Sequence, residues 1–450
     1  MLAYVETIGC QMNVYDTERI QNALKSIGYT ITTDLEGADI IVFNSCAIRE
    51  KAQQKTYSFL GRLSALKAKK TSLIVVLAGC VAQQDGARVR NRLPVVDIVM
   101  GTHAIGSLPQ MVTDIRESKR TSVVNVDFSN DISQFEAFAT VPQKVEPSRF
   151  VTIMQGCDNF CTYCVVPYVR SHEISRSPEN IMTEIKSVIE AGGKEITLLG
   201  QNVNSYGKKE GFPNFTELLY QISQLKGLER IRFTTSHPKD LSEELISAFG
   251  SNPKLCGHIH LPVQSGSSAV LHRMNRHYTR DEYLDKVIKL RQVNPNIAIT
   301  TDIIVGFPGE TNEDFLETVS LLEEVRYDSL FAFMYSDRQG APARLFPEKI
   351  SDFIKKERIH SVLKTQERIT LEKLSLLVGT CQSVLIEGES PRLADGISDA
   401  KEDQYMGRTN CNRIVHVAYT KNSVRKGALI PVYIERAFSH SLYGRLSDQS

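Results

Sequence analysis

The sequence predicts a mixed α/β protein made of three consecutive units, and three observations support that prediction. Short apolar strands alternate with amphipathic helical stretches over roughly the first 115 residues, and the same alternation returns between residue 150 and about residue 340. Beyond Gly379 the pattern changes to alternating strands joined by polar turns, which is typical of a small β-barrel. A chain of 450 residues is also long enough for about three domains.

The first unit, residues 1–116, is expected to be an open α/β domain with a parallel sheet. Its predicted strands and helices are, in order, 3–8, 16–27, 38–43, 50–69 and 73–77. A cysteine follows each predicted strand, at Cys10, Cys46 and Cys80. Because ligands collect at the carboxyl ends of parallel strands, these thiols are expected to converge and to hold a metal cluster. Taken singly, each of them is more often a small buried hydrophobe.

Residues 117–148 lose this periodicity and contain Pro142 and Pro147, so they are expected to form a linker. The next unit, residues 149–375, repeats a strand followed by a helix, which predicts a partial (β/α)6 barrel related to the TIM barrel. Its predicted strands are 150–156, 195–200, 229–235, 257–263, 298–305 and 328–335, and its predicted helices are 178–191, 214–225, 240–250, 280–292, 311–325 and 351–375.

Polar loops follow the predicted barrel strands, and in TIM-type barrels the active site lies at these carboxyl ends. Gln201, Ser236 and Gln264 stand in three of these loops and are expected to line a ligand pocket. The loops at 306–311 and 335–338 are also rich in functional groups. The ring of polar loops therefore predicts a binding site at one end of the barrel.

Cys157, Cys161 and Cys164 have the spacing C-x3-C-x2-C directly after the first predicted barrel strand. A 4Fe-4S cluster normally takes four cysteines, so a compact group of three leaves one iron open to another ligand. A structural zinc site also needs four ligands, usually as two pairs, and only one compact group exists here. The spacing therefore favours an iron-sulfur cluster with an open iron over a zinc site.

The last unit, residues 376–446, is expected to be a small all-β barrel. Its predicted strands are 382–386, 414–418 and 429–434. Cys256, Cys381 and Cys411 show no ligand-like spacing and are expected to be core or surface thiols.

Charge and composition limit the classes of function. Lys and Arg number 53 against 52 Asp and Glu, so the net charge of +1 gives no global attraction for nucleic acid, and any RNA surface must be local. No secretory leader and no run of about 18 apolar residues is visible, so a cytoplasmic protein without a membrane span is expected. In that compartment nine cysteines are better explained as metal ligands, catalytic groups or core residues than as disulfides.

The Cys157 motif resembles the signature of radical S-adenosylmethionine (radical-SAM) enzymes. Nearly the whole chain resembles the radical-SAM methylthiotransferases, and most closely the branch that acts on isopentenyladenosine in tRNA. Two segments carry the resemblance to that branch: residues 44–52, Asn-Ser-Cys-Ala-Ile-Arg-Glu-Lys-Ala, and residues 407–410, Gly-Arg-Thr-Asn. The resemblance implies an N-terminal methylthiotransferase domain, a radical-SAM barrel and a C-terminal RNA-binding TRAM domain.

The resemblance also implies the cofactors. Cys157, Cys161 and Cys164 would hold a 4Fe-4S cluster that binds SAM, with Tyr163 among the cofactor contacts. The three N-terminal cysteines would hold an auxiliary 4Fe-4S cluster that supplies sulfur. SAM then serves as methyl donor and as source of a 5'-deoxyadenosyl radical, which takes hydrogen from C2 of the adenine. Such an enzyme needs an electron donor such as flavodoxin or ferredoxin, and it is expected to work as a monomer.

The expected RNA partner is the tRNA anticodon stem-loop, whose unpaired bases proteins can splay out and stack. Arg49, Arg170, Arg408 and Arg413 are the expected RNA contacts. The segment 47–52 is expected to meet the target base and to offer an apolar niche to its prenyl group.

One departure from the family falls next to Arg170. After Tyr168 the family usually continues with Thr-Arg-Gly and a charged residue, whereas this chain reads Val169, Arg170, Ser171 and His172. Three other functions remain open at this point. Two are methylthiolation of threonylcarbamoyl-adenosine in tRNA and of a ribosomal-protein aspartate, and the third is RNA binding by a non-catalytic iron-sulfur protein. Cleavage of SAM by the reduced protein separates the enzymes from the binding protein.

Overall fold

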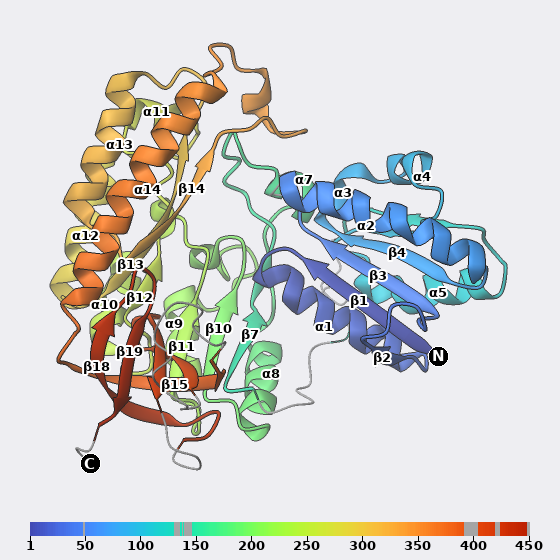
Figure 1. Cartoon of the computed structure of the whole chain (residues 1–450), viewed down its shortest axis with the longest axis horizontal. Helices are drawn as coiled ribbons and strands as arrows, with labels where there is room; N and C mark the ends of the chain where they lie inside the picture. Colours follow the sequence, from blue (N-terminus) through green and yellow to red (C-terminus); the bar gives the residue numbers. More distant parts are fainter. Residues whose placement is uncertain are drawn as a thin grey trace.

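The computed structural model describes residues 1–47, 50–129, 136, 138, 146–390, 404–418 and 424–447. An N-terminal α/β unit, a central unit and a C-terminal barrel follow one another along the chain, drawn from blue through green and orange to red in Figure 1. The N-terminal unit lies beside the first strands of the central unit, and the C-terminal barrel lies at one end of it (Figure 1). The mixed α/β class is therefore confirmed.

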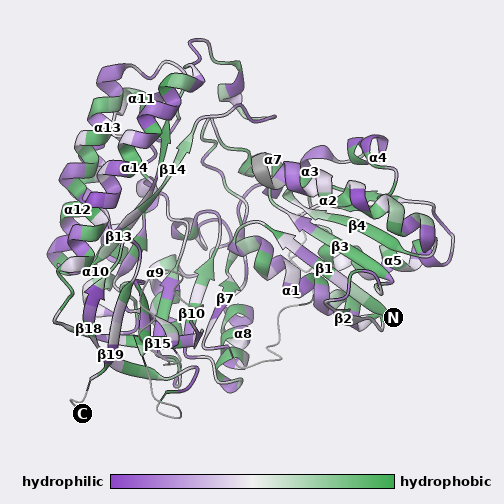
Figure 2. Ribbon diagram, viewed as in Figure 1, coloured by the Kyte–Doolittle hydropathy of each residue, from purple (hydrophilic) through white to green (hydrophobic). Residues whose placement is uncertain are grey.

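The N-terminal unit is a parallel sheet with helices on both faces. The strand order is β2-β1-β3-β4-β5-β6. The strands are β1 (Leu2–Ile8), β2 (Thr30–Thr32), β3 (Ile40–Ser45), β4 (Ile74–Gly79), β5 (Ile98–Met100) and β6 (Val123–Asn125). Helices α1 (Gln11–Ser26) and α5 (Leu108–Arg116) cover one face, and α2 (Glu50–Lys69), α3 (Cys80–Asp85) and α4 (Arg88–Arg92) cover the other. Central strands β3 and β4 are buried throughout, and Figure 2 shows them in hydrophobic colours.

Two boundaries in this unit differ from the prediction: the start of helix α1 and the end of the sheet. Helix α1 begins at Gln11 rather than at residue 16, because Cys10 has extended backbone and takes the N-cap position. Strand β6 lies inside the predicted linker and pairs in parallel with β5, so the sheet continues past residue 116. In this three-residue strand only Val123 is buried, which leaves almost no pattern for sequence to detect.

The central unit contains every predicted barrel strand. They are β7 (Ser148–Thr152), β10 (Glu195–Leu199), β11 (Arg230–Phe233), β12 (His258–His260), β13 (Ala298–Val305) and β14 (Ser329–Met334). They form two parallel sheets, ordered β7-β10-β11 and β12-β13-β14, and a parallel bridge links Ile231 of β11 to Leu255, three residues before β12. Within the described ranges no pairing closes β14 onto β7, so the barrel is open along one side, as predicted.

Helices cover the outside of this open barrel. They are α8 (Pro178–Glu190), α9 (Phe215–Ser223), α10 (Glu243–Ser251), α11 (Ser268–Arg273), α12 (Arg280–Val293), α13 (Asn312–Val325) and α14 (Asp352–Ser375). Helices α9 and α10 begin later than the predicted positions 214 and 240. Asn214 and Ser242 take the N-cap positions just before them, where their side chains accept hydrogen bonds from the first helical turn. Helix α14 runs along β14 (Figure 1).

The C-terminal unit is a closed barrel with the order β15-β16-β17-β19-β18. Its strands are β15 (Cys381–Glu389), β16 (Gln404–Thr409), β17 (Ile414–Ala418), β18 (Leu429–Ala437) and β19 (Leu442–Leu446). Strands β16 and β19 were not predicted, because each carries a glycine where neighbouring backbone leaves no room for a side chain. A Cβ at Gly407 would lie 2.3 Å from the Leu385 carbonyl oxygen, and one at Gly444 would lie 2.2 Å from that of Tyr433.

Buried arginines fix this barrel to the amino ends of the central strands. Arg230, the first residue of β11, donates to the Ser383 carbonyl at 2.8 Å, and Arg232 donates to the Thr409 carbonyl at 2.7 Å. Asp328, directly before β14, pairs with Arg413 at 2.8 Å. The C-terminal barrel therefore lies opposite the carboxyl ends where a TIM-type site is expected. Across the described part of the chain, no helix combines the length and apolar character that crossing a membrane requires.

Candidate active site

The N-terminal cysteines come together, as the strand topology predicted. Strands β1, β3 and β4 are neighbours in the sheet, and Cys10, Cys46 and Cys80 follow their carboxyl ends. The Cys46 thiol hydrogen-bonds with both Cys10 and Cys80. Gly79 makes the turn into α3 with φ +87°, and a Cβ there would lie 2.7 Å from the Ser45 carbonyl oxygen. Packing and turn geometry thus bring the three sulfurs to one edge of the sheet.

Their mutual contacts make two of these thiols acidic. The hydrogen bond with Cys46 lowers the pKa of Cys10 to about 6 and the pKa of Cys80 to about 7, and the positive charge of Arg170 acts in the same direction. The pKa of Cys46 is raised, because its thiol shares hydrogen bonds with both neighbours and is buried. The thiolate is the form that binds metal, so the lowered pKa values of Cys10 and Cys80 favour metal binding at these two thiols.

The second cysteine group lies in the loop that the antiparallel pair β8 (Met154–Gln155) and β9 (Ile174–Ser175) closes. Cys157 donates its backbone N–H to the Ser171 carbonyl at 3.1 Å, which draws the loop together. Gly156 has φ +86°, and a Cβ there would lie 1.9 Å from the His172 carbonyl oxygen, so no larger residue fits. Burial raises the pKa of Cys157 and of Cys164 to about 12, so metal binding at these thiols must release protons.

An N–H group approaches each of these three sulfurs. The distances are 3.6 Å from Asn159 Nδ2 to Cys157 Sγ, 3.4 Å from Arg276 Nη1 to Cys161 Sγ and 3.4 Å from the Val166 backbone nitrogen to Cys164 Sγ. Hydrogen bonds to sulfur are a usual way for a protein to tune an iron-sulfur cluster. Among the described residues no three His, Cys, Asp or Glu side chains gather around one point as a single metal ion requires. Ligands of a 4Fe-4S cluster bind separate irons and need no such common point.

Two residues beside Cys161 were not predicted. Arg276 is buried, and its guanidinium also donates to the Pro262 carbonyl at 2.7 Å. His237 Nδ1 accepts the Lys239 backbone N–H, so the neutral ring carries its proton on Nε2, 4.0 Å from Cys161 Sγ. Arg276 lies 115 residues along the chain from Cys161, and no local pattern in the sequence marks such a contact.

The residues predicted to bind the cofactor surround the loop in different ways. Gln201 Oε1 accepts the Gly156 N–H at 2.5 Å, so it supports the cysteine loop directly. The Ser236 hydroxyl is buried and has no hydrogen-bond partner within the described residues. Tyr163 accepts from Arg276 at 3.3 Å. Gln264 is buried in the loop that follows β12, with φ +75°, and forms a backbone bridge to Ile303.

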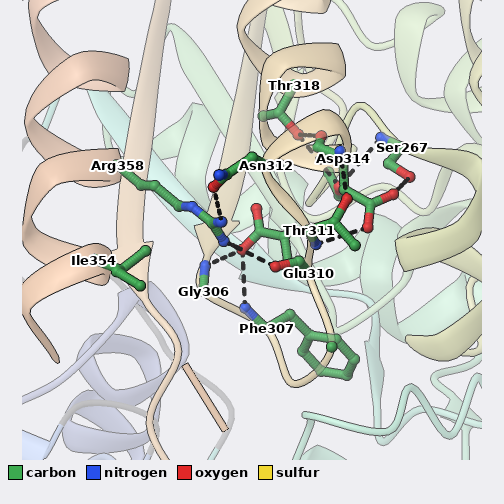
Figure 3. A network of polar contacts seen from close by, with 12 residues as sticks. Ser267, Gly306, Phe307, Glu310, Thr311, Asn312, Asp314, Thr318, Ile354 and Arg358 are labelled. Atoms are coloured by element: carbon green, nitrogen blue, oxygen red, sulfur yellow. Dashed lines mark hydrogen bonds and ion pairs between the residues drawn. The ribbon is translucent and has the colours of Figure 1, made fainter. Parts of the chain in front are cut away.

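A polar network fixes the loop that follows β13 (Figure 3). The Glu310 carboxylate accepts the N–H groups of Gly306 and Phe307, and it lies 3.1 Å from Arg358 of α14. Arg358 also donates to Asn312 at 2.9 Å. Burial raises the pKa of Glu310 to about 7, and the charge of Arg358 opposes that shift. The network therefore ties the carboxyl end of β13 to the long helix outside the barrel.

Replacing Arg358 by Met is expected to destabilise the protein by about 3 kcal/mol at pH 8, because it leaves the ionised Glu310 carboxylate buried and unpaired. At pH 5, below the Glu310 pKa of about 7, the carboxyl is protonated and the same substitution should cost less. Urea unfolding at both pH values measures the difference.

Arg368→Met is a control on the same helix, since its half-exposed guanidinium pairs with Glu323 and Glu372. Exposed pairs contribute up to about 1 kcal/mol. An equal cost of Arg358→Met at pH 5 and pH 8 would contradict the role given to Glu310.

The prediction that Arg170 contacts RNA is wrong, because its guanidinium is only 3% exposed. Arg170 ends helix α7 (Val166–Arg170), which follows the cysteine loop and packs on α3 of the N-terminal unit. Ser171 caps the helix with φ +67°, in the left-handed region that favours glycine. Ser171 thus adopts a conformation that glycine takes more readily, and the chain still turns toward the N-terminal cysteines.

The other predicted RNA contacts have different surroundings. Arg49 lies outside the described residues. Arg408 pairs with Glu387 at 3.1 Å, and Arg413 pairs with Asp328 at the junction with the central unit. An RNA phosphate would compete with a carboxylate at either one, and their contact with RNA stays a prediction. Cys256 is buried and Cys381 is exposed, in the core and surface positions expected of them.

Fold and thiol site together define a radical-SAM protein. Residues 151–322 match the Radical SAM superfamily, and residues 2–101 match the family described as Uncharacterized protein family UPF0004. The fold is similar to the radical S-adenosylmethionine methyltransferase TsrM from Kitasatospora setae, with TM-score 0.57 and 13% identity over 88% of this chain and 79% of that one. It is also similar to the cobalamin-dependent enzyme OxsB, with TM-score 0.53 and 14% identity over 83% of this chain and 56% of that one.

Proteins with similar sequences identify the family within this class. A tRNA-2-methylthio-N(6)-dimethylallyladenosine synthase of Desulfosudis oleivorans is 50% identical over 98% of this chain and 96% of its own. Proteins of the same name from Geobacter metallireducens and Clostridium botulinum are 49% and 46% identical over 99% and 98% of this chain, and over 98% and 96% of their own lengths. The chain belongs to the family of tRNA-2-methylthio-N(6)-dimethylallyladenosine synthases.

Proposed function

We propose that this protein is a radical-SAM methylthiotransferase that modifies C2 of dimethylallyl-adenosine next to the tRNA anticodon. The observation that carries the proposal is the pair of thiol sites, one at the carboxyl ends of β1, β3 and β4 and one on the loop after β8. An aromatic C–H offers no acidic proton to a side-chain base, so this target calls for radical chemistry and a separate sulfur donor. Two thiol sites in one chain meet both needs.

Six cysteines would hold the cofactors. Cys157, Cys161 and Cys164 would bind one 4Fe-4S cluster with SAM at its open iron, and Cys10, Cys46 and Cys80 would bind a second. When bound, these groups supply the electron that cleaves SAM and the sulfur that is transferred. The protein would orient the cluster ligands and donate hydrogen bonds to them. Gln201 accepts from the backbone of the loop that carries Cys157, and Asn159 and Arg276 donate to sulfurs of that loop.

Packing between the two units supports a shared cavity. Helix α1, whose N-cap is Cys10, packs through Met12 and Tyr15 against Leu199 at the end of β10. The Thr152 hydroxyl donates to the Met12 sulfur at 3.7 Å. These contacts hold one thiol site against the carboxyl ends that carry the other, as transfer from one site to a substrate activated at the other requires.

Strand β14 offers an apolar surface for the substrate. Leu330 and Ala332 point into the main core, so Phe331 and Phe333 face the opposite side of the strand, where they are 58% and 39% exposed. Phe333 pairs with Ile304 of β13, and β14 ends beside the group of side chains that Tyr163 contacts. An exposed apolar patch of this kind usually marks a binding site. We assign it to the prenyl group, in place of the segment 47–52, of which only Ala47 has a described side chain.

The substrate preference follows from this surface. A prenyl group has five carbons, and each buried CH2 contributes roughly 0.8 kcal/mol. The carboxylate of threonylcarbamoyl-adenosine would lose its hydration there without gaining a partner, which is costly. The expected activity is therefore on dimethylallyl-modified tRNA, with little on unmodified or threonylcarbamoylated tRNA.

The test incubates the three tRNAs separately with reduced enzyme, SAM and sulfide, followed by mass spectrometry of the nucleosides. Equal methylthiolation of the threonylcarbamoylated tRNA would assign the chain to another substrate. Phe331→Ala is expected to reduce the preference for prenylated tRNA by at least tenfold, since ~1.4 kcal/mol is tenfold. Val293→Ala, which alters a 38% exposed residue on the outer helix α12, should leave the preference unchanged.

The remaining expectations belong to the same proposal. A flavodoxin or ferredoxin would supply the electron, and the chain would act as a cytoplasmic monomer. The first domain would extend to residue 125, where β6 ends. The barrel domain would cover 148–375, and the TRAM domain would cover 376–446.

A further inference from the structure

Arg170 connects the two thiol sites through a single short segment. The cysteine loop runs from Cys157 to Cys164, helix α7 follows at once, and Arg170 is its last residue. Val165 and Val169 of this segment pack in the hydrophobic core of the N-terminal unit, together with Cys80. The segment therefore carries one thiol group and ends inside the unit that carries the other.

The Arg170 guanidinium is buried between the N-terminal cysteines and helix α1. Nη2 donates to Asp16 Oδ2 at 2.8 Å, and both side chains are 3% exposed. Nη1 is buried and has no hydrogen-bond partner among the described nitrogen and oxygen atoms. The positive charge acts on Cys10 and Cys80, and the guanidinium hydrogen-bonds with the Cys80 thiol.

Backbone contacts fix the end of this helix as well. Thr102 donates its hydroxyl to the Val169 carbonyl at 2.8 Å, and His103 Nε2 lies 3.2 Å from the Arg170 carbonyl oxygen. Thr102 and His103 come from the loop after β5. The guanidinium is thus held from two sides, by Asp16 and by its own backbone, and has little freedom to move away from the sulfurs.

Such a position matters because thiolate-bound clusters are anionic. A buried anion is costly unless a cation and hydrogen-bond donors compensate it. Hydrogen bonds to cluster sulfurs and the net charge nearby also set the reduction potential. Reduction adds one negative charge, so a fixed guanidinium favours the reduced state.

We propose that Arg170 is a positioning residue of the N-terminal site, where it compensates the thiolate charge of a bound cluster and raises its reduction potential. The inference rests on the proposed function, because it requires a cluster on Cys10, Cys46 and Cys80. The same fourteen residues, 157–170, would then bind one cluster and set the reduction potential of the other.

The experiment compares Arg170→Gln and Arg170→Lys with the wild type after anaerobic reconstitution. Iron per chain and redox titration followed by electron paramagnetic resonance are the readouts. The titration signal that disappears in Cys10→Ala/Cys46→Ala/Cys80→Ala identifies the N-terminal cluster. Arg170→Gln is expected either to lose that cluster or to shift its potential to a more negative value. Arg170→Lys should restore the cluster with a smaller shift, because it keeps the charge but not the forked donors.

Arg176→Gln is the matched control. Arg176 is also a buried arginine between the two units, where it donates to Tyr15 at 3.2 Å and pairs with Glu184 at 2.7 Å. Its loss should lower stability without moving the potential. Full iron and an unchanged potential in Arg170→Gln would overturn the proposal, and so would an equal shift in Arg176→Gln.

The iron measurements distinguish an error in the proposed function from an error in the role of Arg170. If the wild type and the N-terminal triple variant hold the same iron, the second cluster does not exist, and both proposals fall together. If the triple variant loses iron while Arg170→Gln keeps both its iron and its potential, only the role of Arg170 is refuted.

Discussion

Replacing Cys157, Cys161 and Cys164 together by alanine is expected to abolish reductive cleavage of SAM. Three thiolates bind three irons of a 4Fe-4S cluster and leave the fourth for a further ligand, so without them neither the cluster nor its SAM site can form. Production of 5'-deoxyadenosine under reduction, measured by liquid chromatography, should fall to the level of protein-free samples. Iron content should fall by about half, since one of two equal clusters is lost.

A matched control removes the three cysteines outside both sites. Cys256 is buried in the central unit, Cys381 is exposed, and Cys411 is half-buried with its sulfur 3.5 Å from the Asn296 carbonyl oxygen. Changing Cys256 to Ala and the other two to Ser should leave 5'-deoxyadenosine formation intact. Continued cleavage of SAM by the Cys157 triple variant would refute the assignment of that site.

Replacing Cys10, Cys46 and Cys80 by alanine should separate the two steps of the reaction. The variant is expected to cleave SAM but to form no methylthio product, because these thiols lie at three strand ends of another unit. Iron should again fall by about half. The measurements are iron per chain, 5'-deoxyadenosine and methylthio-nucleoside in the same reaction.

Two results would contradict this separation. Methylthio product from the N-terminal triple variant would show that its thiols do not supply the sulfur. Loss of SAM cleavage together with product would show that the two sites do not act independently. The Cys157 triple variant is the natural comparison, because it should lose both products while keeping the other half of the iron.

Local pattern was enough to predict most of the fold. Helix α2 spans 50–69, as its amphipathic period indicated. The convergence of Cys10, Cys46 and Cys80 followed from a rule of topology, since neighbouring parallel strands end at the same edge. The misses were short or unusually packed elements, such as β6 with its single buried valine and β16 with Gly407 against a backbone carbonyl.

Contacts between distant segments set the limit of prediction at the site. The spacing of the Cys157 motif predicted a group of cluster ligands, but it gave no sign of Arg276 beside Cys161. Arg170 was expected on an RNA surface because surface and buried arginines look alike in a sequence. Its partner Asp16 lies 154 residues away along the chain, so only the packing of the two units shows that the charge is buried.

The attachment of the C-terminal barrel has a consequence for the length of RNA that the protein can engage. Arg230 and Arg232 fix this barrel to the amino ends of the central strands, whereas both thiol sites lie toward the carboxyl ends. Strand β13 has eight residues, which correspond to about 26 Å at ~3.3 Å per residue. An RNA that touches both ends must therefore cover at least this distance along the outside of the molecule. An RNA hairpin shorter than the central strands can therefore contact only one end of the central unit.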